Sequence, residues 1–372
     1  MFLGKSRELQ SIPILAKVRK MIVASPPIPV LLNIPISSFI QDTSNSNQYL
    51  SAKISPQTAW NELILSWNMK PSPNASLIVE VRLFKGNQSS SWYCLGRWNP
   101  TAVAAFTKTN EPSTSDTPGV FPRSSVANQD DSWATVNTDT LHLKQPADTI
   151  QIRLTTQDFS DLNLLTGSFA TANLFATPRP SDTSAWGVLL DAPKRYQNRY
   201  PNGGVICSAT STSMLLGYWS QRLGIPSLDN DVPDVVASVY DEGWKGTGNW
   251  PFNTAYAGSL PGMTGYVSRL RDIRDLESLI AAGFPVACSV SYNLLKGKPR
   301  GSDDGHLVVL VGFTADGDPI FNDPASHEVH TTFKRADFEL GWEDSSHTVY
   351  LIYPTDVKLP NSTDHEWIGS HS

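Results

Sequence analysis

The chain has 372 residues, of which 40% are hydrophobic and 17% are charged, a composition typical of a soluble globular protein. This length exceeds what one hydrophobic core usually serves and predicts two domains. The formal net charge of −6 gives no indication of the strongly basic surface with which proteins bind nucleic acids or anionic membranes. Three widely spaced cysteines (Cys94, Cys207 and Cys288) exclude a disulfide framework and an all-cysteine zinc site.

The N-terminal residues contain no standard targeting signal. Lys17, Arg19 and Lys20 precede the apolar run MIVASPPIPVLL, but prolines interrupt that run and the basic residues lie too far from the first methionine for a signal peptide. No apolar run approaches the ~20 residues that a membrane-spanning helix needs. The sequence leaves open whether the protein is cytoplasmic or exported by a non-standard route, and it predicts no oligomeric state.

Residues 28–178 predict an all-β domain. Short strand patterns such as Ser76–Phe84 and Ser91–Leu95 are separated by turn residues, and no long amphipathic helix is visible. In Thr149–Thr155 apolar and polar residues alternate, as in a strand with one buried face. An antiparallel β-sandwich accounts best for this pattern. Prolines and serines around residues 178–184 then mark a linker.

Five tryptophans in this half allow two interpretations. They are Trp60, Trp67, Trp92, Trp98 and Trp133. Tryptophans in a β-sandwich usually pack in the core or at an edge, and this is the favoured interpretation. An exposed set could instead stack on sugar rings and make the domain a glycan-binding module.

A helix is predicted directly after Cys207. Gly203 and Gly204 form a loop before the cysteine, and apolar residues then recur at the three-and-four spacing of a buried helical face as far as Trp219. Ser208, Thr210 or Ser211 could cap this helix.

The position of Cys207 favours the nucleophilic form of its thiol. Unpaired N–H groups and the positive end of the helix dipole both stabilise a thiolate at a first helical turn. Taken alone, Cys207 is better explained as a small core residue, because unpaired cysteines are among the most buried side chains. The choice therefore depends on what else the chain places near it.

An aromatic stretch follows that could line a substrate cleft or pack a large loop against the helix. Its members are Trp244, Trp250, Phe252, Tyr256 and Tyr266, interspersed with glycines. The candidate substrate-binding residues are Gly204, Trp250 and Tyr256. An amphipathic helix is then predicted over Arg269–Ala282, closed by Gly283, before a buried strand at Val286–Val290.

His306 and Asp323 lie at the two ends of a predicted β-hairpin. An apolar strand begins at His306, a turn follows at Ala315–Asp318, and the returning strand ends just before Asp323. Symmetric pairing would place residue 327 opposite His306, so a bulge or a diagonal contact is needed to bring Asp323 to the ring. His306 could then take the proton of Cys207, with Asp323 fixing its tautomer.

Gln197 completes a candidate site. It lies ten positions before Cys207, and a glutamine amide together with the backbone N–H of the nucleophile can stabilise the oxyanion of acyl transfer. The chain order Gln, Cys, His, Asp is that of a papain-like site. Metal binding was considered for the acidic and histidine residues near the hairpin. Their spacing matches no zinc or calcium pattern, so neither a metal nor another cofactor is predicted; these residues are Asp303, Asp304, His327 and His330.

Residues from Trp186 to about Tyr353 resemble the bacteriocin-processing (double-glycine leader) cysteine peptidase family, specifically its soluble relatives. The matching segments are RYQNRYPNGGVICSATSTSML, NWPFNTAYAGSL, DLESLIAAGFPVACSVSY and GHLVVLVGFTADGDPIFNDPAS. The resemblance implies a papain-like α+β fold over residues 186–355, with Cys207 as nucleophile, His306 as base, Asp323 as its partner and Gln197 as oxyanion residue. The first half is more loosely similar to the β-rich region that precedes this domain in some relatives, with tails at 1–27 and 356–372.

Two features depart from the family pattern. Members that process leader peptides are often fused to an exporter with a membrane domain and an ATPase, and these 372 residues contain neither. Ile206 also stands where an aromatic residue is expected before the nucleophile.

The leading hypothesis is a cysteine peptidase that cleaves a peptide or protein substrate through a thioester. The alternatives are a catalytically idle peptide- or glycan-binding module, or amidase or transglutaminase-type chemistry on the same triad.

Overall fold

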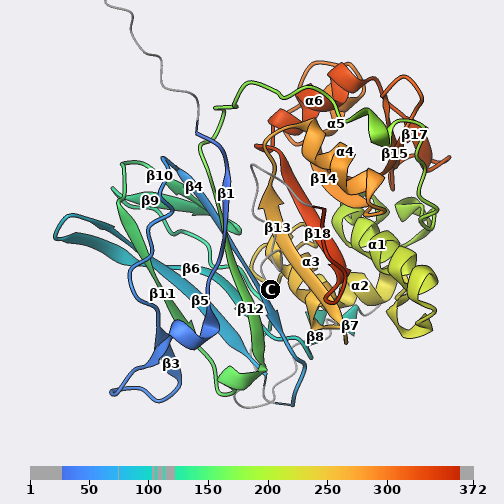
Figure 1. Ribbon diagram of the computed structural model, residues 1–372. Helices are drawn as coiled ribbons and strands as arrows, with labels where there is room; N and C mark the ends of the chain where they lie inside the picture. The colour runs from blue at the N-terminus through green and yellow to red at the C-terminus, as the bar shows by residue number, and fades with distance from the viewer. Residues whose placement is uncertain (1–26, 74, 103–104, 107–111, 114–121, 361–372) are drawn as a thin grey trace, which may run out of the picture.

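The computed structural model describes residues 27–73, 75–102, 105–106, 112–113 and 122–360. Figure 1 shows two halves side by side, the first built of strands and the second of helices and strands. Most of the two predicted tails lies outside the described residues, as do the first six residues of the apolar run that was considered as a signal peptide. No helix in the described part of the chain is long and apolar enough to cross a membrane.

The first half contains two five-stranded antiparallel sheets. Its strands are β1 (Val30–Asn33), β2 (Ile40–Gln41), β3 (Gln48–Leu50), β4 (Glu62–Met69), β5 (Leu77–Lys85), β6 (Gln88–Trp98), β7 (Ala105–Phe106), β8 (Pro112–Ser113), β9 (Ala134–Asn137), β10 (Thr140–Leu143), β11 (Thr149–Thr155) and β12 (Leu162–Ala170). One sheet has the order β1-β12-β4-β10-β9 and the other β2-β3-β11-β5-β6, while β7 and β8 form a separate pair. The strand predicted from alternation at Thr149–Thr155 is β11, with alternate residues buried.

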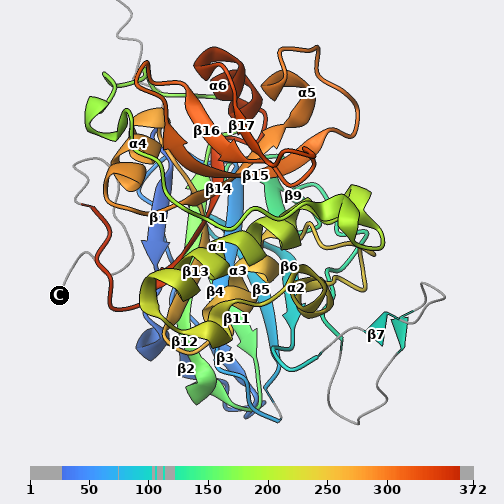
Figure 2. The same cartoon turned by 90° about the vertical axis from the view of Figure 1, so that its right-hand side faces the viewer.

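The second half is a six-stranded antiparallel sheet with helices packed on it. Its elements are α1 (Cys207–Leu223), α2 (Val232–Val239), α3 (Trp250–Ser259), β13 (Met263–Arg269), α4 (Ile273–Ala281), β14 (Val286–Ser291), α5 (Tyr292–Leu295), β15 (Gly305–Phe313), β16 (Pro319–Asn322), β17 (His330–Thr332), α6 (Arg335–Glu343) and β18 (Thr348–Pro354). The strand order is β13-β18-β14-β15-β16-β17. Figure 2 looks onto α1, which contacts β14, β15 and β18.

The helix predicted over Arg269–Ala282 begins later than expected. Arg269 is the last residue of β13, where it pairs with Thr348 of β18. The helix α4 begins only at Ile273, because the Asp272 side chain accepts a hydrogen bond from the backbone N–H of Arg274 and caps it. The prediction was wrong at the N-terminal end because an apolar strand running into an amphipathic helix gives one continuous apolar pattern.

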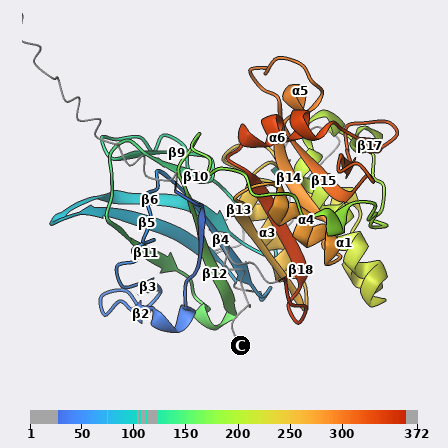
Figure 3. The same cartoon turned by 45° about the horizontal axis from the view of Figure 1, so that its top comes forward.

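All eight residues of β4 are buried, because its two faces meet different partners. On one face, Asn68 donates to the backbone oxygen of Gly265 at 2.7 Å and accepts from the backbone N–H of the same residue at 3.1 Å. The Ser66 hydroxyl accepts from the N–H of Val267 at 3.0 Å. Figures 1 and 3 show β4 and β12 beside β13, which both of them contact. Side chains of the first half therefore satisfy the backbone of β13.

This contact covers a sheet edge. The strand β13 is the outermost strand of the second-half sheet, and an uncovered edge exposes unpaired N–H and C=O groups that promote association between chains. Close approach requires Gly258 of α3, since a Cβ atom there would lie 2.2 Å from the Asn68 amide. The interface also contains an ion pair between Arg269 and Glu62, with Nη2 and Oε2 2.9 Å apart.

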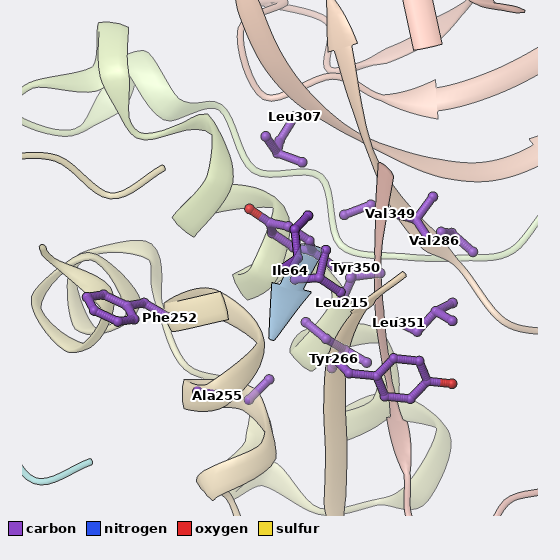
Figure 4. Close-up of a cluster of buried hydrophobic side chains, with 14 of the residues drawn as sticks. Ile64, Leu215, Phe252, Ala255, Tyr266, Val286, Leu307, Val349, Tyr350 and Leu351 are labelled. Carbon is purple, nitrogen blue, oxygen red and sulfur yellow. The ribbon is translucent and has the colours of Figure 1, made fainter. Parts of the chain in front are cut away.

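The buried hydrophobic residues form one continuous cluster that includes members of both halves. Figure 4 shows Ile64 of β4 among residues of the second half, including Leu215 of α1, Phe252 of α3 and Tyr350 of β18. Chain length predicts two separate cores, whereas the structure joins the two halves through shared apolar packing. The predicted domain boundaries at 28–178 and 186–355 stay a prediction.

Replacing Asn68 by Ala should destabilise the whole chain by about 2–4 kcal/mol, because both backbone groups of Gly265 lose their buried partner. Urea unfolding of the full chain measures this change. Asn163→Ala is the matched control, since Asn163 lies exposed in the neighbouring strand β12 and its removal should change stability by less than ~0.5 kcal/mol. Equal losses in the two variants would show that the edge contact contributes nothing special.

Candidate active site

Cys207 is the first residue of α1 and is partly exposed, whereas Cys94 and Cys288 are buried. The expected hydroxyl cap is wrong. Ile206 occupies the N-cap position and provides no side-chain hydrogen bond, while the Thr210 hydroxyl donates back to the Ile206 carbonyl. No capping side chain therefore competes with the thiol for the first N–H groups of the helix, which favours a thiolate there.

Polar side chains hold the start of α1 against the sheet. The Ser208 hydroxyl lies 2.7 Å from the Tyr350 hydroxyl of β18, and the Ser211 hydroxyl donates to the backbone oxygen of Leu307 on β15 at 3.2 Å. Thr212 donates to the Asn253 side chain of α3 at 3.1 Å. Buried hydroxyls with partners cost little and fix orientation, so this short polar stretch positions Cys207 relative to β15.

His306 reaches Asp323 through a bulge and a diagonal contact. β15 and β16 pair Leu310 with Phe321 and Gly312 with Ile320, so the register shifts by one residue between these pairs. The imidazole Nε2 lies 2.8 Å from Asp323 Oδ1, and both side chains are buried. The hairpin thus contains both of the features that the sequence spacing offered as alternatives, a bulge and a diagonal contact.

Asp323 accepts three hydrogen bonds. Besides His306, the backbone N–H of Ala325 donates to Oδ1 at 2.9 Å and the Tyr292 hydroxyl donates to Oδ2 at 2.8 Å. Burial raises the pKa of Asp323, but the His306 hydrogen bond and charge outweigh burial, so the pKa lies below its ordinary value. The carboxylate is therefore ionised, and the His306 nitrogen facing it carries a proton.

Cys207 and His306 shift each other's pKa. Burial raises the pKa of the Cys207 thiol, but the positive charge of His306 and its hydrogen bond bring it below the ordinary value. Burial lowers the pKa of His306, yet the Cys207 charge and the Asp323 hydrogen bond raise it to about 9. By contrast, burial raises the pKa of both Cys94 and Cys288. Among the three, only Cys207 has partners that outweigh burial, because Arg97 beside Cys94 does not bring the pKa of that thiol below its ordinary value.

Gln197 contacts the segment that carries Asp323 through its backbone. It is buried in a short 3-10 helix, Gln197–Arg199, and its backbone N–H donates to the Pro324 carbonyl at 2.9 Å. Its side-chain Oε1 is buried without a hydrogen-bond partner. This oxygen can only accept a hydrogen bond, so the amide nitrogen of Gln197 is the side-chain group that could donate to an oxyanion.

Tyr292 was not predicted from the sequence. Its hydroxyl bonds Asp323, and its ring lies 4.2 Å from that of His306, centroid to centroid, at 43°. Lys296 Nζ lies 3.4 Å from the centre of the same ring. The one available signal is that Tyr292 directly follows the strand β14, whose residue Val290 pairs with His306. Only knowledge of this strand pairing would have identified it.

A cavity of about 630 Å³ opens beside Cys207 and His306, between the two halves. Its lining includes the predicted Gly204 and Trp250 but not Tyr256, which is buried in α3. Residues from both halves line it: Glu62, Asn137, Thr138, Asp139, Thr140, His142, Gly204, Val205, Cys207, Ser208, Trp244, Gly248, Trp250, Arg269, Ser289, Asp303, Gly305, His306, Leu307, Asp344, Ser345 and Ser346. The first-half residues come from the start of β4 and from β9, β10 and the turn between them.

Asp139 connects the first half to this cavity. Its Oδ2 accepts from the backbone N–H of Trp250, the first residue of α3, at 2.6 Å, and its Oδ1 accepts from the Thr140 hydroxyl at 3.0 Å. Burial raises the pKa of Asp139 to about 6. The first half thus fixes the start of the helix that presents Trp250 to the cavity.

Over the described ranges, no three His, Cys, Asp or Glu side chains are grouped so that they could hold a metal ion.

Two family models match the chain. Residues 189–350 match the Peptidase C39 like family, and residues 38–161 match a Peptidase C39 N-terminal domain. A solved chain from Bacillus anthracis, described as a C39-like peptidase, is 19% identical and aligns over 47% of this chain and 98% of its own length, with a TM-score of 0.32. No protein with a curated description matches.

Iodoacetamide should alkylate Cys207 rapidly at pH 6, where on the order of 1% or less of an ordinary thiol is ionised. The lowered pKa of Cys207 keeps its thiolate populated there, whereas Cys94 and Cys288 should stay unlabelled in the folded chain. Mass spectrometry of digested protein measures all three rates in one sample. A Cys207 rate that rises tenfold per pH unit up to pH 8 would show an unperturbed thiol.

Proposed function

Because the chain belongs to the Peptidase C39 like family, we propose that it is a cysteine peptidase with Cys207 as nucleophile. The observation that carries this proposal is the linked group of a thiol at a helix start, an imidazole at its side and a carboxylate 2.8 Å from that imidazole. The proposed substrate is a peptide or a protein.

In the proposed acylation step, the Cys207 thiolate attacks the carbonyl carbon of the scissile bond. A carbon–sulfur bond forms and the carbonyl oxygen becomes an oxyanion. The His306 imidazolium then donates its proton to the amide nitrogen as the carbon–nitrogen bond breaks, leaving a thioester on Cys207. Asp323 keeps the ring oriented and stabilises its positive charge throughout.

Deacylation reverses the role of His306. The neutral imidazole removes a proton from water, the resulting hydroxide attacks the thioester, and the Cys207 thiolate leaves with its charge stabilised by the regenerated imidazolium. The Gln197 amide and the backbone N–H of Cys207 are the proposed donors to the oxyanion in both steps. The hydrogen bond from the Gln197 backbone N–H to the Pro324 carbonyl, which holds Gln197 next to the segment carrying Asp323, supports this role.

We assign the first half as a β-sandwich accessory domain that helps to form the substrate cleft. Its two antiparallel sheets and its contribution to the cavity lining support this assignment. Its tryptophans give little support to a sugar platform, since Trp60, Trp67 and Trp98 are buried. The ring of Trp92 faces two guanidinium groups, those of Arg82 and Arg153.

A proteome-derived peptide library, incubated with wild-type protein and with Cys207→Ala, tests the activity. The wild type should cut and the variant should not, because no other described cysteine has a histidine partner. Cys288→Ala is the matched control: it should keep cutting while losing about 1 kcal/mol of stability from the buried site. Cleavage by Cys207→Ala would refute the proposal, and transfer of the acyl group to an added amine in place of water would redirect it to a transferase.

Asp323→Asn should lower kcat/KM and move the alkaline limb of its pH profile from near pH 9 toward neutrality. Asp323 is one of the groups that raise the pKa of His306 to about 9, so its loss lets the imidazolium deprotonate at lower pH. Asp316→Asn, in the exposed turn of the same hairpin, is the control and should leave the profile unchanged. If the alkaline limb of the Asp323→Asn profile stays near pH 9, then Asp323 does not raise the pKa of His306.

A further inference from the structure

Trp244 is a large apolar side chain that remains exposed inside the catalytic cavity. Half of its surface, 51%, is accessible, whereas Trp67, Trp98 and Trp342 are fully buried. It lines the same cavity as Cys207, together with Val205, which is 70% exposed. Exposing this much apolar surface next to a nucleophile costs free energy unless a ligand covers it.

The ring of Trp244 is supported from beneath by glycine backbone. A Cβ atom at Gly246 would lie 2.8 Å from the indole, and one at Gly248 would lie 2.7 Å from it. No other residue type fits at these two positions without displacing the ring. The indole therefore packs directly on the backbone of its own loop and presents its other side to the cavity.

The backbone of this loop is fixed by one buried carboxylate. Oδ1 of Asp241 accepts from the N–H groups of Gly243 at 2.9 Å and Trp244 at 3.1 Å, and Oδ2 accepts from the Asn249 amide at 2.9 Å. The backbone N–H of Ser125, in the first half, also donates to Asp241 at 2.8 Å. A ring held this way loses little conformational entropy when a ligand packs on it.

The loop is also tied to the nucleophile. The Thr247 hydroxyl donates to the carbonyl of Val205, two residues before Cys207, at 3.3 Å. Gly204, which also lines the cavity, has open space where a Cβ would stand. Trp244 and Val205 thus form an apolar wall that is continuous with the segment carrying the thiol.

We propose that Trp244 and Val205 form an apolar subsite that receives a large apolar side chain of the substrate, close to the scissile bond. This inference rests on the proposed peptidase function and names a substrate class for it: peptides with a bulky aliphatic or aromatic residue near the cut. Aromatic side chains packed in such pockets contribute disproportionately to binding.

The test is a cycle between enzyme and peptide variants. Cleavage sites in the proteome-derived library identify a position near the cut where wild-type enzyme prefers bulky apolar residues, and two peptides are then made with Phe or Gly there. Wild-type kcat/KM should be about tenfold or more higher for the Phe peptide. Trp244→Ala should lower kcat/KM for the Phe peptide much more than for the Gly peptide, and so remove most of this ratio.

Two further variants serve as controls. Trp244→Phe keeps an aromatic face and should keep most of the Phe-to-Gly ratio. Leu340→Ala removes a side chain that is also 51% exposed but lies on α6 and does not line the cavity, so its ratio should equal that of the wild type. The rate of Cys207 alkylation by iodoacetamide should be the same in all four proteins, which shows that the nucleophile is intact.

The outcomes separate the two proposals. A wild-type protein that cuts no peptide and whose Cys207 is no more reactive than Cys94 or Cys288 overturns the peptidase function and this subsite with it. Cleavage without any apolar preference near the cut, or a Phe-to-Gly ratio that survives Trp244→Ala, overturns the subsite alone.

Discussion

The hydrogen bonds between Asn68 and the backbone of Gly265 are the contact on which the rest of the structure depends. β13 is the outermost strand of its sheet, so its outer N–H and C=O groups need partners, and side chains of β4 provide them. This fixes the first half against the second. The same contact positions two further parts of the first half, Glu62 at the start of β4 and the turn between β9 and β10. Both line the cavity that Cys207 also lines.

Inside that cavity, buried charge is stabilised by specific partners rather than by solvent. Asp323 is almost inaccessible to water, and three donors replace the hydration of its carboxylate. Tyr292 contributes twice, through its hydroxyl on Asp323 and through its ring beside His306. Groups fixed before substrate arrives need no reorganisation as charge develops, which is how a protein site can stabilise a transition state more effectively than water does.

The sequence predicts the local parts of the site well. A cysteine at a helix start, a histidine at the beginning of an apolar strand and an acid just after the hairpin are each set by residues close in the chain. The spacing of the histidine and the acid also shows that a bulge or a diagonal contact must join them. Contacts between distant segments leave no such signal. Tyr292, the first-half residues of the cavity and the strand at Arg269 all depend on which strands pair and which faces meet.

The loop that carries Trp244 shows why the two halves act as one unit. Its anchoring residue Asp241 accepts a hydrogen bond from Ser125 of the first half, and its Thr247 donates to Val205, two residues before Cys207. Asp139 of the first half in turn caps the start of α3 at Trp250. The Ser125 and Asp139 bonds join the first half to segments that line the cavity, and the Thr247 bond joins two of those segments to each other. A displacement of the first half would therefore move the walls of the cavity relative to the thiol, so the shape of the cavity depends on the position of the first half.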